Sequence, residues 1–459
     1  MARHRLRTSA LVLLVIVLAA AAAAAGFLVT DHLRRPQPTA QQRSVPTPSA
    51  YAGADAAPRA AAATTTPVPS RAAIATALRP ALRAAGLGPR VLAQVVDART
   101  GSTLLDRSGG TGAAPASTLK LTTAAAVLAV HAATDRIRTV ARSDGRGTLV
   151  LVGAGDPTLS AAGAGERPRY AGAARLADLA AQVRRAKVSV RRIVVDDSAY
   201  RGATVSPDWA AEDVPSEYGA AITPLLADGG RADPDDDVRS ATPDVAAGKA
   251  FARLLGRSSL PVTRTATTTA TGRVVAAVRS APIATLVEQM LLQSDNVIAE
   301  SLARQVARSQ HATASFPGAA AAVRAVLRDR LGVDIGGGLR DGSGLAPADR
   351  ISPAALTALL HAVVRSSNQG VRGITGALPV AAWSGSLAPR YLSGASRAGA
   401  GLVRAKTGTL TGVSTLAGLV HTPRGGLVAF AVFADRNDDT AAAQAALDAL
   451  VARLATCRC

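Results

Sequence analysis

Segments with the pattern of β-strands lie near both ends of the ordered part of the chain, and this placement restricts the folds open to it. Residues 90–97 and 103–106 are apolar runs on either side of a short turn. Residues 402–406, 413–421 and 427–434 have the same character, and a Pro-Arg-Gly-Gly turn separates the last two. Because helical segments fill the sequence between, we expect one sheet assembled from distant parts of the chain.

Helices are predicted next to these strands. Before the first strand, Ile74, Leu78, Leu82 and Leu87 recur at helical spacing, and Gly88 ends the pattern. Two further helices are expected over residues 117–131, entered through Pro115, and over residues 440–454.

The long middle of the chain has elements of its own. Residues 148–152 and 192–196 are predicted strands, so residues 131–281 are interpreted as an inserted domain. The remaining residues, 71–130 and 282–459, are expected to form the main domain. This organisation predicts an α/β (α+β) protein with an antiparallel sheet flanked by helices.

The N-terminal part is predicted to lie outside any globular core. Basic residues precede an unbroken apolar run over residues 10–29, which is long enough to span a bilayer as a helix. We expect residues 1–33 to be a membrane anchor, with a cleaved signal peptide as the close alternative. Residues 34–70 are rich in Pro, Ala and Thr and are expected to be a linker. Under both alternatives the rest of the chain acts outside the cytoplasm.

The composition argues against two classes of function. The formal net charge is +20, but aromatic residues make up only 3% of the chain, which leaves little material for base stacking, so we expect no nucleic-acid partner. The histidines are scattered without metal-binding spacing, and Cys457 and Cys459 lie at the extreme C-terminus, so we expect no metal site and no cofactor.

Lysine is scarce in this arginine-rich chain: among 52 basic residues, only Lys120, Lys187, Lys249 and Lys406 are lysines. A buried Lys can lose its proton and act as a base, whereas Arg cannot. Positions that keep Lys are therefore candidates for chemistry that needs a tunable amine.

Ser117 and Lys120 lie three positions apart in the first turn of a predicted helix, so that hydroxyl and amine are neighbours. Serine is a poor nucleophile until a base takes its proton, and a desolvated Lys can be that base. The alternative is a solvated Lys beside a helix-capping Ser.

Ser294-Asp295-Asn296 interrupts two helical segments. The Ser hydroxyl can pass protons to a leaving group, and the Asn amide can hold a substrate carbonyl. The alternative is a simple N-cap for the second helix.

Lys406-Thr407-Gly408-Thr409 closes a predicted strand. Gly408 lets a substrate backbone approach the strand edge, and the hydroxyls of Thr407 and Thr409 can receive a carboxylate. The alternative is an exposed strand end.

The three motifs occur in the order S-x-x-K, S-x-N, K-T-G, which is the signature of β-lactamases and penicillin-binding proteins. The chain resembles the penicillin-binding protein 4 type of D-alanyl-D-alanine carboxypeptidase/endopeptidase, a low-molecular-mass class C group, because a long segment separates Ser117 from Ser294. Segments 217–220 and 341–345 look like the same family. The resemblance covers residues 72–454 and implies a β-lactamase/transpeptidase-like fold.

The resemblance also implies roles. Ser117 would be the acylated nucleophile and Lys120 its base, while Ser294 and Asn296 would relay protons and orient the substrate. Lys406 would support Ser294 and the substrate carboxylate, and the backbone N–H groups of Ser117 and Thr409 would form the oxyanion hole. The implied partners are peptidoglycan stem peptides or cross-bridges and β-lactam antibiotics.

Two other functions stay open at this point. A serine β-lactamase would share the acylation step and add rapid deacylation, although no Glu-x-x-Leu-Asn segment lies between the first two motifs. A non-catalytic cell-wall binding homologue would keep the fold for recognition alone.

The predicted linker leads to one test. Deleting the residues before Ser70 should give an active, freely soluble enzyme, because the expected anchor and linker contribute nothing to the core. Penicillin labelling of the truncated and full-length proteins measures this, and an inactive but well-folded truncation would contradict the linker assignment.

Overall fold

The structure is a computed structural model that describes residues 68–267 and 272–457, all within one compact unit that spans residues 65–459. The apolar run at 10–29, nearly all of the expected linker, and Cys459 lie outside the described residues. Within the described ranges, no helix is both long and apolar enough to cross a membrane.

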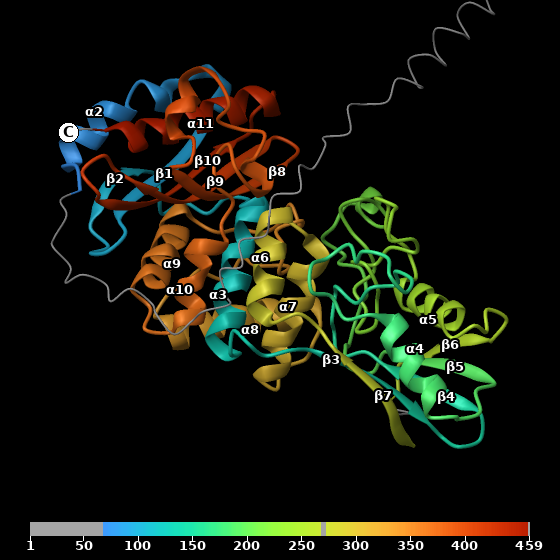
Figure 1. The fold of residues 1–459 in the computed structure, drawn as a ribbon. Coiled ribbons are helices and arrows are strands. Elements are labelled where there is room, and N and C mark those ends of the chain that lie inside the picture. The colour runs from blue at the N-terminus through green and yellow to red at the C-terminus, as the bar shows by residue number, and fades with distance from the viewer. Residues whose placement is uncertain (1–67, 268–271, 458–459) are drawn as a thin grey trace, which may run out of the picture. The chain divides into compact units, whose positions relative to one another are not determined.

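A first sheet joins strands from both ends of the described chain (Figure 1). Its strands are β1 (Arg90–Asp97), β2 (Thr103–Arg107), β8 (Val403–Leu410), β9 (Val413–His421) and β10 (Leu427–Asp435). Their order is β2-β1-β10-β9-β8, and every neighbouring pair is antiparallel. β1 pairs with β10 along its whole length, with Arg90 opposite Asp435 at one end and Asp97 opposite Val428 at the other. The prediction of one sheet built from distant segments is therefore confirmed.

Helices cover both faces of this sheet, because its strands are apolar on both sides. Phe430 and Phe433 of β10 are both fully buried, yet they belong to different cores. One face is covered by α2 (Arg71–Leu78) and α11 (Thr440–Thr456). The opposite face is covered by a helical layer formed by α3 (Lys120–Val130), α6 (Ile283–Gln293), α7 (Asn296–Ser309), α8 (Phe316–Leu331), α9 (Pro353–Arg365) and α10 (Gln369–Ala377).

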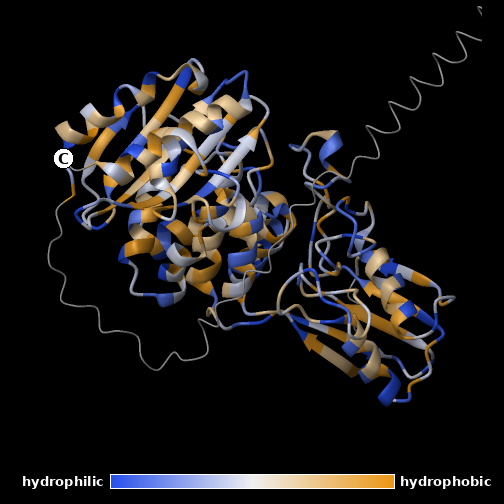
Figure 2. Cartoon of the chain, turned by 45° about the horizontal axis from the view of Figure 1, so that its top comes forward, coloured by the Kyte–Doolittle hydropathy of each residue, from blue (hydrophilic) through white to orange (hydrophobic). Residues whose placement is uncertain are grey.

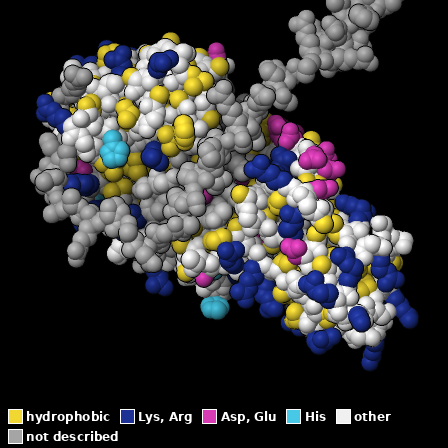
Figure 3. All heavy atoms as spheres, in the orientation of Figure 1, with side chains coloured by type: hydrophobic (Ala, Val, Ile, Leu, Met, Phe, Trp, Pro, Cys, Tyr) yellow, Lys and Arg dark blue, Asp and Glu magenta, His cyan; other side chains and the backbone are white. Residues whose placement is uncertain are grey.

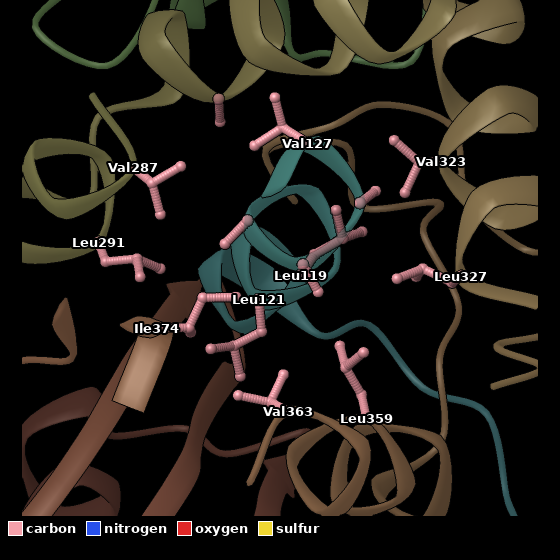
Figure 4. Packing of buried hydrophobic residues seen from close by; sticks show 14 of the residues in the cluster. Leu119, Leu121, Val127, Val287, Leu291, Val323, Leu327, Leu359, Val363 and Ile374 are labelled. Carbon is pink, nitrogen blue, oxygen red and sulfur yellow. The ribbon is translucent and has the colours of Figure 1, made fainter. Parts of the chain in front are cut away.

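Helix α3 lies at the centre of the helical layer. Apolar side chains of the surrounding helices point toward it from several sides, among them Leu291, Leu327 and Leu359 (Figure 4). Every residue of α3 from Lys120 to Leu128 is buried, although a helix on a protein surface would expose one side. The helix is therefore fixed in position by packing on all sides.

A second sheet is formed entirely by residues between Arg138 and Arg279. Its strands are β3 (Arg138–Ser143), β4 (Thr148–Val152), β5 (Arg192–Asp196), β6 (Val262–Thr265) and β7 (Arg273–Arg279), in the order β6-β5-β4-β3-β7. The β4–β5 and β5–β6 pairs are parallel and the others antiparallel. With α4 (Leu176–Arg185) and α5 (Pro243–Leu254) it encloses a core of its own, and Figure 2 shows hydrophobic colouring on its strands.

Three elements differ from the sequence prediction. The helix expected up to Leu87 ends at Leu78, because Pro80 has no N–H to continue the ladder, and short 3-10 turns follow. Ser117 lies in a 3-10 turn, Ala116–Leu119, and the α-helix begins only at Lys120. The strand expected to close at Lys406 continues to Leu410, because β9 pairs with it along that length.

Charged side chains are unevenly distributed on the face shown in Figure 3. Lys and Arg side chains are scattered over much of that face, whereas Asp and Glu side chains gather mainly in one area. On this face the positive charge of the chain is therefore spread out.

Gly418 of β9 allows β8 to approach closely, which gives a test of the fold. A Cβ at Gly418 would collide with the backbone of Arg404 and Ala405 in β8. We expect Gly418→Ala to lower the free energy of unfolding by about 1–3 kcal/mol, because strand backbone cannot give way cheaply. Denaturant titration measures the change.

The matched control is Gly373→Ala on the exposed side of α10, where an added Cβ meets nothing within 4 Å. This variant should be as stable as the parent or slightly more so, since Ala favours helix over Gly. Equal stability of the Gly418 and Gly373 variants would contradict the packing described here.

Candidate active site

Ser117 lies at the entrance to α3, in a turn that the surrounding chain constrains. Ala116 has a φ of 47°, a left-handed conformation that is unfavourable for a residue with a Cβ. The carbonyl of Pro115 accepts a hydrogen bond of 2.7 Å from the Thr415 hydroxyl on β9, which ties the turn to the sheet. These constraints hold the half-buried Ser117 in a defined orientation.

The Lys120 amine lies one turn further on and is fully buried. Its Nζ is 2.8 Å from Ser117 Oγ, 2.6 Å from Asn296 Oδ1 and 2.8 Å from the Ser343 carbonyl oxygen. Burial lowers the pKa of Lys120 from 10.5 to about 8, against the opposing effect of nearby carboxylates, chiefly Asp341. The neutral amine is therefore far more populated near neutral pH than it would be for an ordinary lysine.

Asn296 begins α7, directly after a break in the helical layer. Ser294 has a φ of 58° and ends α6, and the Asp295 side chain caps α7 by accepting from the backbone N–H groups of Val297 and Ile298. The capping role considered for this triplet is thus filled by Asp295. It leaves the Ser294 and Asn296 side chains free for other contacts.

A contact to the part of the chain that carries the second sheet (residues 138–279, the second-sheet part) orients the Asn296 amide. Its Nδ2 donates to the carbonyl of Tyr218 over 3.0 Å, so that Oδ1 faces Lys120. Asn296 therefore accepts a hydrogen bond from the lysine amine.

Asp295 connects the break to residues that sequence analysis did not single out. Its Oδ2 accepts from the Tyr170 hydroxyl at 2.7 Å and from Arg239 Nη2 at 2.9 Å, and all three side chains are buried. Burial alone would raise the pKa of Asp295, but the Arg239 guanidinium and the hydrogen bonds hold it well below its usual value. Single Tyr and Arg residues far away in the sequence carry no recognisable signal for such a contact.

Strand β8 supplies the second buried amine. Lys406 Nζ is 2.9 Å from Ser294 Oγ and 2.8 Å from the Thr407 carbonyl. Burial, together with the nearby charges of Lys120 and Arg390, holds the pKa of Lys406 well below its usual value. Ser294 and Lys406 thus form a second hydroxyl–amine pair beside Ser117 and Lys120.

The residues after Lys406 form the edge of the site. Thr407 Oγ1 is 2.7 Å from the Ser386 hydroxyl, a partner that sequence analysis missed. Gly408 lies so close to Pro115 and Thr415 that a Cβ would collide with both, and the exposed Thr409 accepts from Gln444 over 3.2 Å. Gly408 therefore permits the close packing of β8 against the Ser117 turn.

These residues meet at one cleft of about 450 Å³. The two buried lysines lie beneath it, and Gly408 lies between the two threonines in β8. All the site residues predicted from the sequence are thus brought together. The lining includes Ser117, Ser294, Asn296, Thr407 and Thr409, together with Arg169, Glu217, Tyr218, Arg231, Asp237 and Arg239 from the second-sheet part.

Nothing in the described residues suggests a metal centre. Within residues 68–267 and 272–457, no three His, Cys, Asp or Glu side chains gather so that they could hold a metal ion. The side chains that line the cleft carry hydroxyls, an amide, guanidinium groups and separate carboxylates.

Comparison with known proteins agrees with this geometry. Residues 74–237 and 234–457 match the D-Ala-D-Ala carboxypeptidase 3 (S13) family. The chain belongs to this family. Carboxypeptidase DacB of Mycolicibacterium smegmatis is 40% identical over 399 residues, which cover 86% of each chain. A carboxypeptidase of Mycobacterium tuberculosis is 37% identical over 403 residues, which cover 86% of this chain and 87% of that protein.

The prediction of a serine-type D-alanyl-D-alanine carboxypeptidase is therefore confirmed at the level of the family. The D-Ala-D-Ala peptides on which this family acts are part of the cell wall. The enzyme therefore acts outside the cytoplasm.

Solved structures confirm the predicted fold. Penicillin binding protein 4 from Haemophilus influenzae superimposes with a TM-score of 0.68 at 20% identity, covering 85% of this chain and all of that chain. A predatory endopeptidase from Bdellovibrio bacteriovorus, solved with an immunity protein, has a TM-score of 0.50 at 16% identity and covers 79% and 91% of the two chains.

The buried Arg239–Asp295 pair gives a test of how the site is held together. Arg239→Met should lower the free energy of unfolding by about 3–5 kcal/mol, because it leaves a buried carboxylate without its cation. The double variant Arg239→Met/Asp295→Asn should recover much of that loss, since the Asn still caps α7.

Arg169→Met is the matched control, because the Arg169–Asp237 pair lies at the surface and contributes little. Denaturant titration compares the variants. An Arg239→Met protein as stable as the Arg169→Met protein would contradict a structural role for the buried pair.

Proposed function

We propose that the enzyme cleaves D-alanyl-D-alanine peptides of peptidoglycan through an acyl-enzyme formed on Ser117. The observation that carries this proposal is the 2.8 Å contact between Ser117 Oγ and an amine whose pKa is lowered to about 8. Lys120 takes the hydroxyl proton while Ser117 Oγ forms a bond to the carbonyl carbon of the penultimate D-Ala. No metal or cofactor is needed for this step.

The second hydroxyl–amine pair, Ser294 and Lys406, takes part in the next proton transfer. As the C–N bond breaks, the leaving D-Ala amine must gain a proton, and Ser294, hydrogen-bonded to Lys406, is the hydroxyl placed to deliver it. Asn296 orients the substrate amide, and the backbone N–H groups of Ser117 and Thr409 stabilise the oxyanion. Water then hydrolyses the ester and regenerates the Ser117 hydroxyl.

The threonines of β8 determine which end of the substrate binds in the cleft. The hydroxyls of Thr407 and Thr409 both line the cleft, and together with Lys406 they suit a terminal carboxylate. We assign carboxypeptidase action to this arrangement, and endopeptidase action to cross-bridged peptides that fit the same cleft.

Penicillins imitate this substrate and should acylate Ser117. Penicillin binding protein 4 from Haemophilus influenzae, which shares the fold, has been solved in complex with a β-lactam. The chemistry needed for acylation is the same as for the peptide, namely a nucleophilic hydroxyl beside a neutral amine.

The parts of the chain are assigned separate tasks. Residues 71–130 and 282–459 carry catalysis, and residues 131–281 form an inserted domain that borders the cleft through Tyr218 and Arg239. Residues 1–33, with the apolar run at 10–29, act as a membrane anchor or a cleaved signal peptide, and residues 34–70 link them to the enzyme.

Mass spectrometry after treatment with benzylpenicillin tests this function. The parent should gain one adduct per chain, which peptide mapping should place on Ser117, and nitrocefin should be turned over slowly. Lys120→Arg should slow acylation by about 100- to 10,000-fold despite the preserved charge, because Arg cannot accept the serine proton. Normal labelling of that variant would remove Lys120 from the base role, and rapid nitrocefin turnover by the parent would favour a β-lactamase.

A further inference from the structure

We propose that Glu300, buried in α7 behind the active site, is a positioning residue for acylation: it fixes the turn whose carbonyl aims the Lys120 amine at Ser117. The inference rests on the role proposed for Lys120. Glu300 does not contact the cleft, so its effect must pass through the turn at residues 341–345.

The geometry around Nζ explains why that carbonyl matters. A neutral amine has two N–H bonds and one lone pair, and Lys120 has three oxygen neighbours. The oxygens of Asn296 and Ser343 can only accept, whereas the Ser117 hydroxyl has a proton to give. If both acceptors are occupied by the two N–H bonds, the lone pair is left pointing at Ser117.

The Ser343 carbonyl belongs to a turn that is held from several sides. Asp341 accepts from the backbone N–H groups of Ser343 at 3.0 Å and Gly344 at 2.7 Å. The Gly342 carbonyl accepts from the Thr123 hydroxyl on α3 at 2.6 Å. The Gly342 N–H, which lies two peptide units before the Ser343 carbonyl, needs a separate partner.

Glu300 supplies that partner. Its Oε1 accepts from Gly342 N at 2.8 Å, and the side chain is completely buried. Because Glu300 lies four residues after Asn296, both side chains project from the same side of α7. One helix therefore places both acceptors of the lysine N–H bonds, Asn296 directly and Ser343 through the turn.

Arg304 holds the Glu300 carboxylate in place. Its Nη1 is 3.2 Å from Glu300 Oε2, and both side chains are at most 1% exposed. The guanidinium also stacks over the ring of Phe316, 4.2 Å from its centroid. Arg304 thus leaves the other carboxylate oxygen to the Gly342 N–H.

A matched pair of double variants isolates the hydrogen bond from the charge. Glu300→Gln/Arg304→Met keeps an acceptor for the Gly342 N–H, Glu300→Leu/Arg304→Met removes it, and neither leaves a buried charge unpaired. The rate constant of acylation by benzylpenicillin and the dissociation constant of the preceding complex are measured by stopped flow between pH 6 and pH 10 for both.

The Leu variant should acylate at least about tenfold more slowly than the Gln variant at high pH, with a similar dissociation constant, because only the aim of the base has changed. Equal acylation rates of two folded variants would overturn the proposal. So would a loss confined to the dissociation constant, because a distorted cleft rather than a misplaced base would then be the cause.

Glu300→Asp provides a second route should the Leu variant fail to fold. It keeps the charge beside Arg304 but is one methylene too short for the Gly342 N–H. Slower acylation with retained circular dichroism supports the proposal, and an unchanged rate overturns it. The outcome is separable from the proposed function, because a parent that is not labelled on Ser117 refutes the function itself, whatever the variants do.

Discussion

The burial of the Lys120 amine, which lowers its pKa, is the constraint on which the rest of the site depends. An ammonium group removed from water loses its hydration, so burial favours the neutral form of Lys120. Among the described residues, the amine forms hydrogen bonds with two side-chain oxygens and one backbone carbonyl, and with no carboxylate. An Asp or Glu in direct contact would favour the protonated form of the lysine. Asp341 and Glu300 raise its pKa from a distance, and their hydrogen bonds hold the turn that carries the Ser343 carbonyl.

Three separate parts of the chain must meet for this arrangement to exist. The 3-10 turn before α3 supplies Ser117, and the first residue of α3 supplies Lys120. The break between α6 and α7 supplies Ser294 and Asn296, and β8 supplies Lys406. Ala116 and Ser294 have positive φ angles without being glycines. Such unfavourable backbone persists only where packing enforces it, and here it lies beside the two hydroxyls of the site.

The second-sheet part completes the site rather than merely bordering it. The Tyr218 carbonyl orients the Asn296 amide, and the buried Arg239 and Tyr170 hold the carboxylate that caps α7. The position of the Asn296 amide therefore depends on residues that lie outside all three motifs. Substitutions at Tyr170 or Arg239 are therefore expected to change the site without altering a motif residue.

Features of the fold and the site were predictable from the sequence where they depend on neighbouring residues, and not where they depend on residues far apart in the chain. The strands of the first sheet and the motif residues were predictable, because apolar runs and the spacing from Ser117 to Lys120 are local patterns. The 3-10 turn at Ser117 was not, because it depends on a hydrogen bond from Thr415, nearly 300 residues away. Likewise, Tyr170, Arg239, Ser386 and Glu300 are single polar residues whose partners become neighbours only in the folded chain.

Titration of the Lys120 amine tests the central claim most directly. Because the chain contains few lysines, selective carbon-13 labelling of lysine side chains gives a spectrum in which the Lys120 signal can be assigned by comparison with Lys120→Arg. We expect an apparent pKa of about 8 for this amine. A Lys120 signal that titrates at or above the ordinary value of 10.5 would show that burial does not favour the neutral amine, and the site described here would then lack its central feature.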